Sequence, residues 1–231
     1  MLKNYCHRDI LECGIDEVAR GTLFGRVYAA AVIWPQYIEM PEGLVIKDSK
    51  KLSAKKRIIM ADFIKENAID YSIAYADENE IDNSNILNCA IKAMHRAVKG
   101  LNIIPELLLV DGNYFKEYFY GFGKFISHEC IIKGDATYTS IACASILAKV
   151  EHDKYITDMI ETHPELEIYD LGKNMGYSTK KHMLAIQKYA PSPWHRLTFK
   201  RVREFVKDCM WPFLEEFRIE TWKDEIAIKL S

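Results

Sequence analysis

Four acidic side chains occur where strands are expected to end. Asp16 and Glu17 follow a short apolar run, Asp111 ends another, and Asp135 comes just before a predicted helix. A carboxylate at the carboxyl end of a buried strand lies where open α/β sheets tend to place their chemistry. Two adjacent carboxylates repel each other unless a cation neutralises them, and hard divalent cations prefer oxygen ligands. These residue types therefore indicate a site for divalent cations such as Mg²⁺.

Each acid taken alone has a simpler interpretation. The pair Asp16–Glu17 fits the start of a solvated loop, Asp111 an Asp-Gly turn, and Asp135 an amino-terminal helix cap. Strand pairing decides between the interpretations. If the strand after Glu17 folds back antiparallel and the strand ending at Asp111 lies parallel beside the first, Asp16 and Asp111 become neighbours. Such a cluster suits two Mg²⁺ ions about 3.5–4 Å apart, which stabilise the attacking and leaving oxygens of an in-line phosphoryl displacement.

Apolar runs and turn signals predict the elements that hold these acids. The five expected strands are a run from residue 11 to the acidic pair at its tip, and residues 27–34, 69–76, 107–110 and 125–132. The expected helices cover residues 54–66, 86–98, a segment from near 138, 180–190 and 199–217. Ser53 is expected to cap the helix at 54, and Thr179 the helix at 180. An acidic loop is expected before the helix at 86, and an irregular link over 162–172.

Size and composition exclude several classes of protein. With 231 residues, 49% of them hydrophobic, the chain can bury a substantial core. No apolar run is long enough to span a bilayer, and the amino terminus lacks the layout of a secretory signal. The six cysteines are scattered without a CxxC pair, so neither a disulfide framework nor a zinc spacing is visible. We expect reduced thiols and a soluble cytoplasmic protein.

The charges are unevenly distributed although the formal net charge is only −2. Residues 47–57 carry six basic side chains against one acid, and residues 173–207 carry nine Lys or Arg against one Glu. One such run alone is most simply a solvated helix face. Two runs in a chain with carboxylates at strand ends favour contact with the phosphates of a nucleic acid. Acids for metals and basic surfaces for phosphates together indicate a metal-dependent nuclease.

Several sequence blocks in the same order resemble ribonuclease HII, the type 2 ribonuclease H family, from about Leu11 to Glu204. The blocks are GIDEVARG (14–21), AAAVI (29–33), DSKKLS (48–53), NILNCAIKAM (85–94), LLVDG (108–112), KGDATYTSIACASILAKVEHD (133–153), GYSTKKH (176–182) and HRLTF (195–199). A set of ordered blocks is far more specific than a lone acidic pair.

The resemblance implies an α/β, ribonuclease H-like fold. Its five-stranded mixed sheet, three antiparallel strands followed by parallel ones, is flanked by helices and has a helical carboxyl-terminal extension. Residues 1–170 would form the catalytic domain, and residues 171–231 a helical region that packs on it and clamps substrate. The implied protein is a monomer that does not act at membranes.

The implied activity is that of a metal-dependent endonuclease. The family hydrolyses the RNA strand of RNA–DNA hybrids and incises 5′ to ribonucleotides embedded in duplex DNA, leaving a 3′-hydroxyl and a 5′-phosphate by a two-metal mechanism. Primer removal and ribonucleotide excision repair are the roles that this activity serves. Asp16, Glu17, Asp111 and Asp135 match the four catalytic carboxylates that bind Mg²⁺ or Mn²⁺.

Further positions match residues near the substrate. Tyr177 matches the tyrosine that stacks on the deoxyribose beyond the ribonucleotide, and Ser49 and Lys50 match positions near substrate phosphates. Asp153 occupies the place of an acidic residue near the metals, and would bind an auxiliary metal or hold a metal ligand in place. In most relatives an arginine precedes it, which here is His152.

The loop after the acidic pair departs from the family pattern. The family usually has Gly-Arg-Gly in this loop, which contacts the ribose 2′-hydroxyl, whereas this chain has Ala19, Arg20 and Gly21. A Cβ at position 19 restricts close approach and positive φ. We therefore expect intact cleavage of hybrids and a weaker preference for the junction at a lone ribonucleotide. Phe24, where relatives commonly have Ala, is expected to narrow the groove.

Other functions fit less well. A junction resolvase or a type 3 ribonuclease H would share the fold, and a nucleic-acid-binding subunit without catalysis would share the basic surfaces. The presence of all four acids argues against the inactive subunit. No GxGxxG follows the first strand, which argues against a dinucleotide-binding protein.

Overall fold

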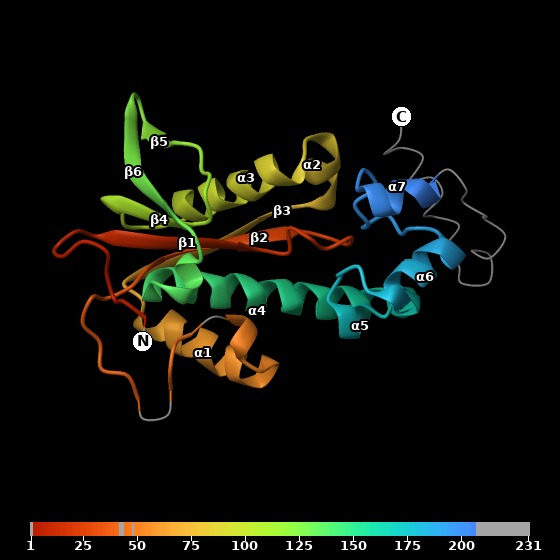
Figure 1. Cartoon of the computed structure of the whole chain (residues 1–231), viewed down its shortest axis with the longest axis horizontal. Coiled ribbons are helices and arrows are strands. Elements are labelled where there is room, and N and C mark those ends of the chain that lie inside the picture. Colours follow the sequence, from red (N-terminus) through yellow and green to blue (C-terminus); the bar gives the residue numbers. More distant parts are fainter. Residues whose placement is uncertain (1, 42–43, 48, 207–231) are drawn as a thin grey trace. The chain divides into compact units, whose positions relative to one another are not determined.

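The computed structural model describes residues 2–41, 44–47 and 49–206 (Figure 1). The expected helix over 199–217 is observed as α7 (Lys200–Val206), and the rest of that segment lies outside the described residues. The carboxyl-terminal 25 residues of the predicted clamping region lie outside them too. None of the helices in the described ranges is long and apolar enough to cross a membrane.

The central sheet has six strands in the order β3-β2-β1-β4-β6-β5. β1 (Glu12–Val18) pairs antiparallel with β2 (Val27–Ile33), which pairs antiparallel with β3 (Asp70–Ala76). β1 pairs parallel with β4 (Leu107–Asp111), and β4 pairs parallel with β6 (Lys124–Ile131). The three antiparallel strands followed by parallel ones are therefore confirmed.

The sixth strand corrects the expected five. β5 (Tyr118–Gly121) forms a hairpin with β6, and the turn uses Gly123 at φ 69°. Three of its four residues are exposed, so the run lacks the alternation of apolar and polar residues by which a half-buried strand is recognised.

Helices were predicted best where a side chain caps them. α1 (Ala54–Asn67) begins after Ser53, whose hydroxyl accepts from the Lys56 amide, as expected. The segment expected as an acidic loop is instead α2 (Glu78–Asn83). It begins with a capping box, in which Asp77 accepts from the Glu80 amide and Glu80 accepts from the Asp77 amide.

The remaining helices complete the chain. α3 (Ile86–Lys99) precedes β4, and α4 (Thr139–Thr162) follows β6. The expected irregular link contains a 3₁₀ helix, Pro164–Tyr169, and a short α5 (Leu171–Asn174). α6 (Lys180–Tyr189) begins after Thr179, whose side chain caps it as predicted. Two further 3₁₀ helices, η1 (Ser49–Lys51) and η2 (Gly134–Ala136), precede α1 and α4.

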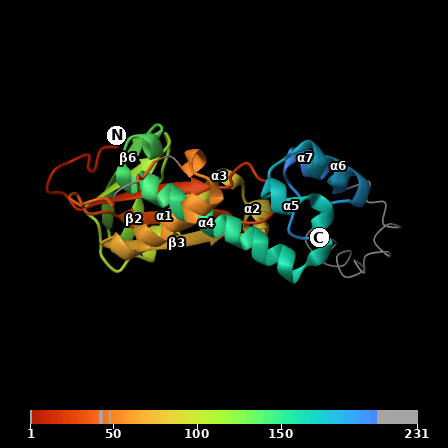
Figure 2. The same cartoon turned by 90° about the horizontal axis from the view of Figure 1, so that it is seen from below.

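Helices cover both faces of the sheet (Figures 1 and 2). On one face, Cys13 and Ile15 of β1 pack in a cluster with Ala93 and Ala97 of α3. On the other face the amino-terminal part of α4 lies against β1 at Gly14, where a Cβ would be 2.2 Å from the carbonyl carbon of Ser140. Because side chains alternate along a strand, Asp16 projects on the same face as Gly14, towards α4.

The chain divides into two compact units. One contains the whole sheet and comprises Met1–Val18, Val27–Ala76 and Leu87–His152. The other comprises Ala19–Arg26, Asp77–Ile86 and the chain from Asp153 onwards. The predicted boundary at residue 170 remains a prediction. The loop after Glu17 belongs with the carboxyl-terminal unit, because Arg196 binds its carbonyl groups, as described below.

Candidate active site

Asp16 and Asp111 lie side by side on the adjacent strands β1 and β4. The parallel ladder pairs Ile15 with Val110, so the next residue along each strand is an aspartate. β1 continues through both acids to Val18, because Glu17 pairs with Ala29 of β2. The acidic pair, expected at the tip of this strand, therefore lies within its paired length, and Val18 is the last residue of the strand.

Asp135 is held close to this pair through a hydrogen bond of the preceding residue. The chain leaves β6 through Lys133 in the left-handed conformation, with φ 58°, and turns into η2. The Gly134 amide donates to Oδ1 of Asp111 at 2.7 Å. This bond fixes η2, and with it Asp135, at the end of β4.

The pKa shifts show that the charges of the carboxylates influence one another. Burial raises the pKa of Asp16 well above its ordinary value, and the charges of Glu17, Asp111 and Asp135 raise it further, against a hydrogen bond from Ser145. Burial also raises the pKa of Asp111, against the bond from Gly134. A cation at this place would relieve the repulsion, and carboxylate oxygens are the donors that Mg²⁺ and Mn²⁺ prefer. The donor types present therefore suit a divalent ion, while in the described residues no three of these carboxylates have ligand atoms within 4.8 Å of one another.

Ser49 and Lys50 lie at the edge of the same cluster. The Ser49 and Ser145 hydroxyls are 3.1 Å apart, so η1 is hydrogen-bonded to α4. Nζ of Lys50 lies 3.8 Å from Oδ2 of Asp135. The Lys50 side chain is 82% exposed, so its ammonium group remains accessible to a substrate phosphate.

The second unit contains the other predicted substrate residues. Ala19 adopts φ 69°, the left-handed conformation that a glycine would favour. The Thr22 hydroxyl donates to the Ala19 carbonyl at 3.0 Å, and the Leu23 amide donates to the Gly176 carbonyl at 2.8 Å. Thr22 forms an isolated bridge with Tyr177. The loop 19–26 and the Tyr177 segment are thus held together.

One buried guanidinium organises this loop. Arg196 is fully buried and donates to four carbonyl groups, those of Arg20, Thr22, Gly25 and Arg26, at 2.8–3.1 Å. Burial lowers the pKa of Arg196 to about 10, against the attraction of Asp82 and Glu78. Arg196 lies in the HRLTF block, but the sequence indicates no role for it, because nothing in the spacing relates residue 196 to residues 20–26.

Two buried histidines hold the Tyr177 segment. The Ser192 amide donates to Nδ1 of His195 at 2.9 Å, so that nitrogen is the acceptor. His195 Nε2 therefore carries the proton and donates to Nε2 of His182 at 2.9 Å. Nδ1 of His182 then donates to the Tyr177 carbonyl at 3.0 Å. With these tautomers, every ring nitrogen of the two histidines has a hydrogen-bond partner, and this holds only when both rings are neutral.

The structure bears on the sequence predictions for Phe24 and Asp153 in different ways. Phe24 is completely buried and packs edge-on against His195, with ring centroids 5.2 Å apart, so the expectation that it narrows a groove is wrong. Asp153 belongs to α4 within the second unit, and its carbonyl accepts from Thr157. Its proposed role near the metals remains a prediction.

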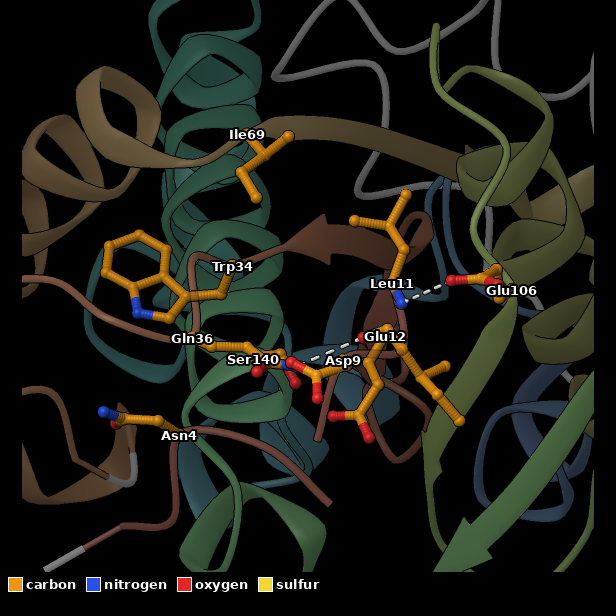
Figure 3. Close-up of a pocket in the computed structure, with 10 residues that line it drawn as sticks. Asn4, Asp9, Leu11, Glu12, Trp34, Gln36, Ile69, Glu106 and Ser140 are labelled. Carbon is orange, nitrogen blue, oxygen red and sulfur yellow. Dashed lines mark hydrogen bonds between the residues drawn. The ribbon is translucent and has the colours of Figure 1, made fainter. Parts of the chain in front are cut away.

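A separate pocket of about 260 Å³ lies at the start of β1 (Figure 3). It is lined by Asn4, Asp9, Ile10, Leu11, Glu12, Trp34, Gln36, Ile69, Glu106 and Ser140. None of the predicted site residues contributes to it. β1 thus has a pocket at its beginning and the carboxylates towards its end.

Comparison with solved structures defines the class of protein. Ribonuclease H2 from Pyrococcus horikoshii superposes with a TM-score of 0.70 at 22% identity, covering 85% of this chain and 97% of that one. Bst-RNase HIII in complex with Mn²⁺ superposes with a TM-score of 0.64 at 17% identity, covering 86% of this chain and 70% of that one. The fold is that of the type 2 and type 3 ribonucleases H.

Sequence comparison then gives the family. The family model for ribonuclease HII matches residues 13–202. A ribonuclease HII from Phocaeicola vulgatus is 44% identical over 199 residues, which cover 86% of this chain and 94% of the relative. The chain belongs to the ribonuclease HII family and is an endoribonuclease of the ribonuclease H class.

Proposed function

We propose that this protein is a divalent-metal-dependent endonuclease acting on nucleic acids that contain both ribonucleotides and deoxyribonucleotides. It hydrolyses the RNA strand of RNA–DNA hybrids and incises 5′ to ribonucleotides embedded in duplex DNA, leaving a 3′-hydroxyl and a 5′-phosphate. The observation that carries the proposal is the placement of Asp16 beside Asp111, with Asp135 bound to the end of β4 through Gly134.

Asp16, Glu17, Asp111 and Asp135 would hold the metal ions. The raised pKa values of Asp16 and Asp111 support this assignment, because burial and the charges of neighbouring carboxylates disfavour the ionised forms, which a bound divalent cation would stabilise. When bound, a pair of Mg²⁺ or Mn²⁺ ions would activate the attacking water and stabilise the leaving 3′-oxygen. The Mn²⁺ complex of the type 3 enzyme with the same fold supports such a centre.

The other groups bind and orient the substrate. Lys50 is exposed beside Asp135 and would bind a phosphate close to the scissile bond. The loop at Ala19–Gly21 would place backbone groups against the ribose 2′-hydroxyl, which distinguishes RNA from DNA. Tyr177 is 39% exposed, so its ring is available to stack on the neighbouring deoxyribose. This activity would serve primer removal and ribonucleotide excision repair.

A strand-specific cleavage assay tests the proposal. The substrates are an RNA–DNA hybrid, duplex DNA with one ribonucleotide, an RNA duplex and a branched DNA, each with Mg²⁺, Mn²⁺ or a chelator. We expect metal-dependent cleavage of the first two only. Asp111→Asn should lower the rate at least about 100-fold, the scale on which loss of one electrostatic group at a reacting centre is felt.

The outcomes separate the alternatives. Cleavage of the branched DNA would indicate a resolvase, and cleavage of the continuous hybrid without incision at a single ribonucleotide would indicate activity of the type 3 kind. Binding without cleavage in any metal would indicate an inactive subunit. Cleavage unaffected by Asp111→Asn would overturn the assignment of the site.

A further inference from the structure

The amino-terminal segment and β6 bring a thiol, an imidazole and a carboxylate together. His7 Nε2 lies 2.8 Å from Oε1 of Glu129, and Sγ of Cys6 lies 3.8 Å from Oε2 of the same residue. The ligand atoms of all three residues lie within 4.8 Å of one another. Across the described ranges, no other group of three or more His, Cys, Asp or Glu residues meets that distance.

These donors differ from those of the carboxylate cluster. Sulfur, imidazole nitrogen and carboxylate oxygen are the three donor types that Zn²⁺ binds in proteins, at about 2.0–2.3 Å in a tetrahedral arrangement. A thiolate and a carboxylate together would neutralise a divalent ion. Mg²⁺ prefers oxygen ligands only, so the two sites would take different metals.

We propose that Cys6, His7 and Glu129 form a binding site for Zn²⁺ or a similar thiophilic divalent ion, with water as the fourth ligand. The side chains of His7 and Glu129 are 44% and 45% exposed, so an ion can enter from solvent. No spacing in the sequence indicates the site, because Glu129 is more than 120 residues from the other two ligands.

The chain around the ligands is already fixed. The buried Glu12 carboxylate accepts hydrogen bonds from the backbone amides of Cys6 and His7, which orients both residues before any ion binds. The Tyr138 hydroxyl donates to Sγ of Cys6 at 3.2 Å, which orients the sulfur. Groups that orient metal ligands in this way commonly change metal affinity about 10–100-fold when removed.

The site would join the amino-terminal segment to the sheet near the catalytic carboxylates. The Lys3 amide donates to the Thr137 carbonyl at 2.8 Å, and the Thr139 amide donates back to the Lys3 carbonyl at 2.9 Å. Thr137 in turn caps η2, which carries Asp135. An ion on Cys6, His7 and Glu129 would therefore hold this segment against the turn that follows Asp135, without contributing to the catalytic cluster itself.

Metal titrations of the full-length, reduced protein test the proposal. Co²⁺ and Zn²⁺ are the probes, and the Asp111→Asn background weakens binding to the carboxylates. With Co²⁺ we expect a thiolate-to-cobalt charge-transfer band in the near ultraviolet. With Zn²⁺, competition against a chromophoric chelator should give one tight equivalent. Cys6→Ser should abolish the band and weaken Zn²⁺ binding at least about 10-fold, and Glu129→Gln should also weaken binding.

Cys130→Ser is the matched control, since Cys130 is an exposed thiol on the same strand outside the cluster. This variant should keep the band and the Zn²⁺ affinity. Zn²⁺ should raise the thermal midpoint of the parent and of Cys130→Ser by more than it raises that of Cys6→Ser. Far-ultraviolet circular dichroism of the metal-free variants would exclude misfolding as the cause.

Three results would overturn the proposal: no thiolate band in the parent, a band that persists in Cys6→Ser, or a band lost in Cys130→Ser. None of these readouts depends on cleavage, so the metal site and the nuclease function can fail separately.

Discussion

At the scale of single residues, Ala19 keeps a left-handed backbone conformation that its Cβ makes unfavourable. The sequence suggested that a Cβ at this position restricts positive φ, yet Ala19 adopts φ 69°. A left-handed conformation costs an L-residue about 1–2 kcal/mol. The hydrogen bonds around the loop must offset that cost, because the Ala19 carbonyl accepts from Thr22 and Arg196 binds the residues that follow.

Ala19→Gly should therefore change substrate choice more than stability. Removing the Cβ relieves the left-handed strain, but glycine adds about 0.5–1 kcal/mol of unfolded-chain entropy, so we expect stability to change by no more than about 1 kcal/mol. Closer approach of the backbone to the 2′-hydroxyl should raise the ratio of cleavage at a lone ribonucleotide to cleavage of a continuous hybrid. An unchanged ratio would refute a role of the Cβ in junction preference.

At the scale of elements, Arg196 fixes the loop 19–26 through backbone carbonyl groups. Arg196→Lys keeps the charge but cannot donate to four carbonyls arranged around a planar guanidinium. Buried carbonyls left without donors cost about 1–3 kcal/mol each, so we expect a loss of at least about 2 kcal/mol in urea unfolding. Discrimination of the lone ribonucleotide should weaken as well.

Arg203→Lys is the control for that substitution. Arg203 lies on α7 and is exposed, so the same change there should alter stability by less than about 0.5 kcal/mol. An equal loss in the two variants would show that the carbonyl bonds of Arg196 are not the cause.

The paired histidines should make the second unit sensitive to acid. Burial lowers the pKa of His182 below its ordinary value of 6.5, against the bond to Tyr177. The unfolded chain therefore binds more protons than the folded chain just below pH 6.5, and stability must fall as the pH decreases through that value towards the folded pKa.

The measurement compares wild type with His182→Gln by urea unfolding at pH 7.5 and pH 5.5. Wild type should lose more stability between the two values than the variant does. His95, whose pKa burial also lowers, contributes equally to both proteins and cancels in the difference. Equal losses would exclude His182 as a source of the acid sensitivity.

At the scale of the whole molecule, binding should depend on local cationic groups rather than on the net charge of −2. Arg201 is exposed on α7, and its guanidinium donates to the Ser178 hydroxyl at 2.8 Å, next to Tyr177. We expect Arg201→Ala to weaken hybrid binding and to reduce the slope of log affinity against log salt by about one. The slope is measured by fluorescence anisotropy between low and moderate salt, and an unchanged slope would place Arg201 outside the phosphate contacts.

The sequence predicted the structure best where a single residue determines the local backbone. It predicted least where residues far apart in the chain come into contact. Ser53 and Thr179 cap helices as expected, and the apolar runs locate the strands on either side of Asp16, whereas their pairing was implied by the family resemblance. The α2 helix was missed because its capping box was not recognised within an acidic segment, and β5 because its side chains are exposed. The partners of Arg196 and Glu129 depend on the tertiary fold, which no local pattern encodes.

The guanidinium of Arg196 also has a consequence for how the loop can evolve. It binds main-chain oxygens, which every residue type provides, so side chains along the loop can be exchanged while its path is retained. Substitutions at Ala19, Thr22 or Phe24 would leave the four carbonyl groups that Arg196 binds in the chain. Substitutions in the loop can therefore change its side chains while its backbone path is kept, provided that residue 196 remains arginine.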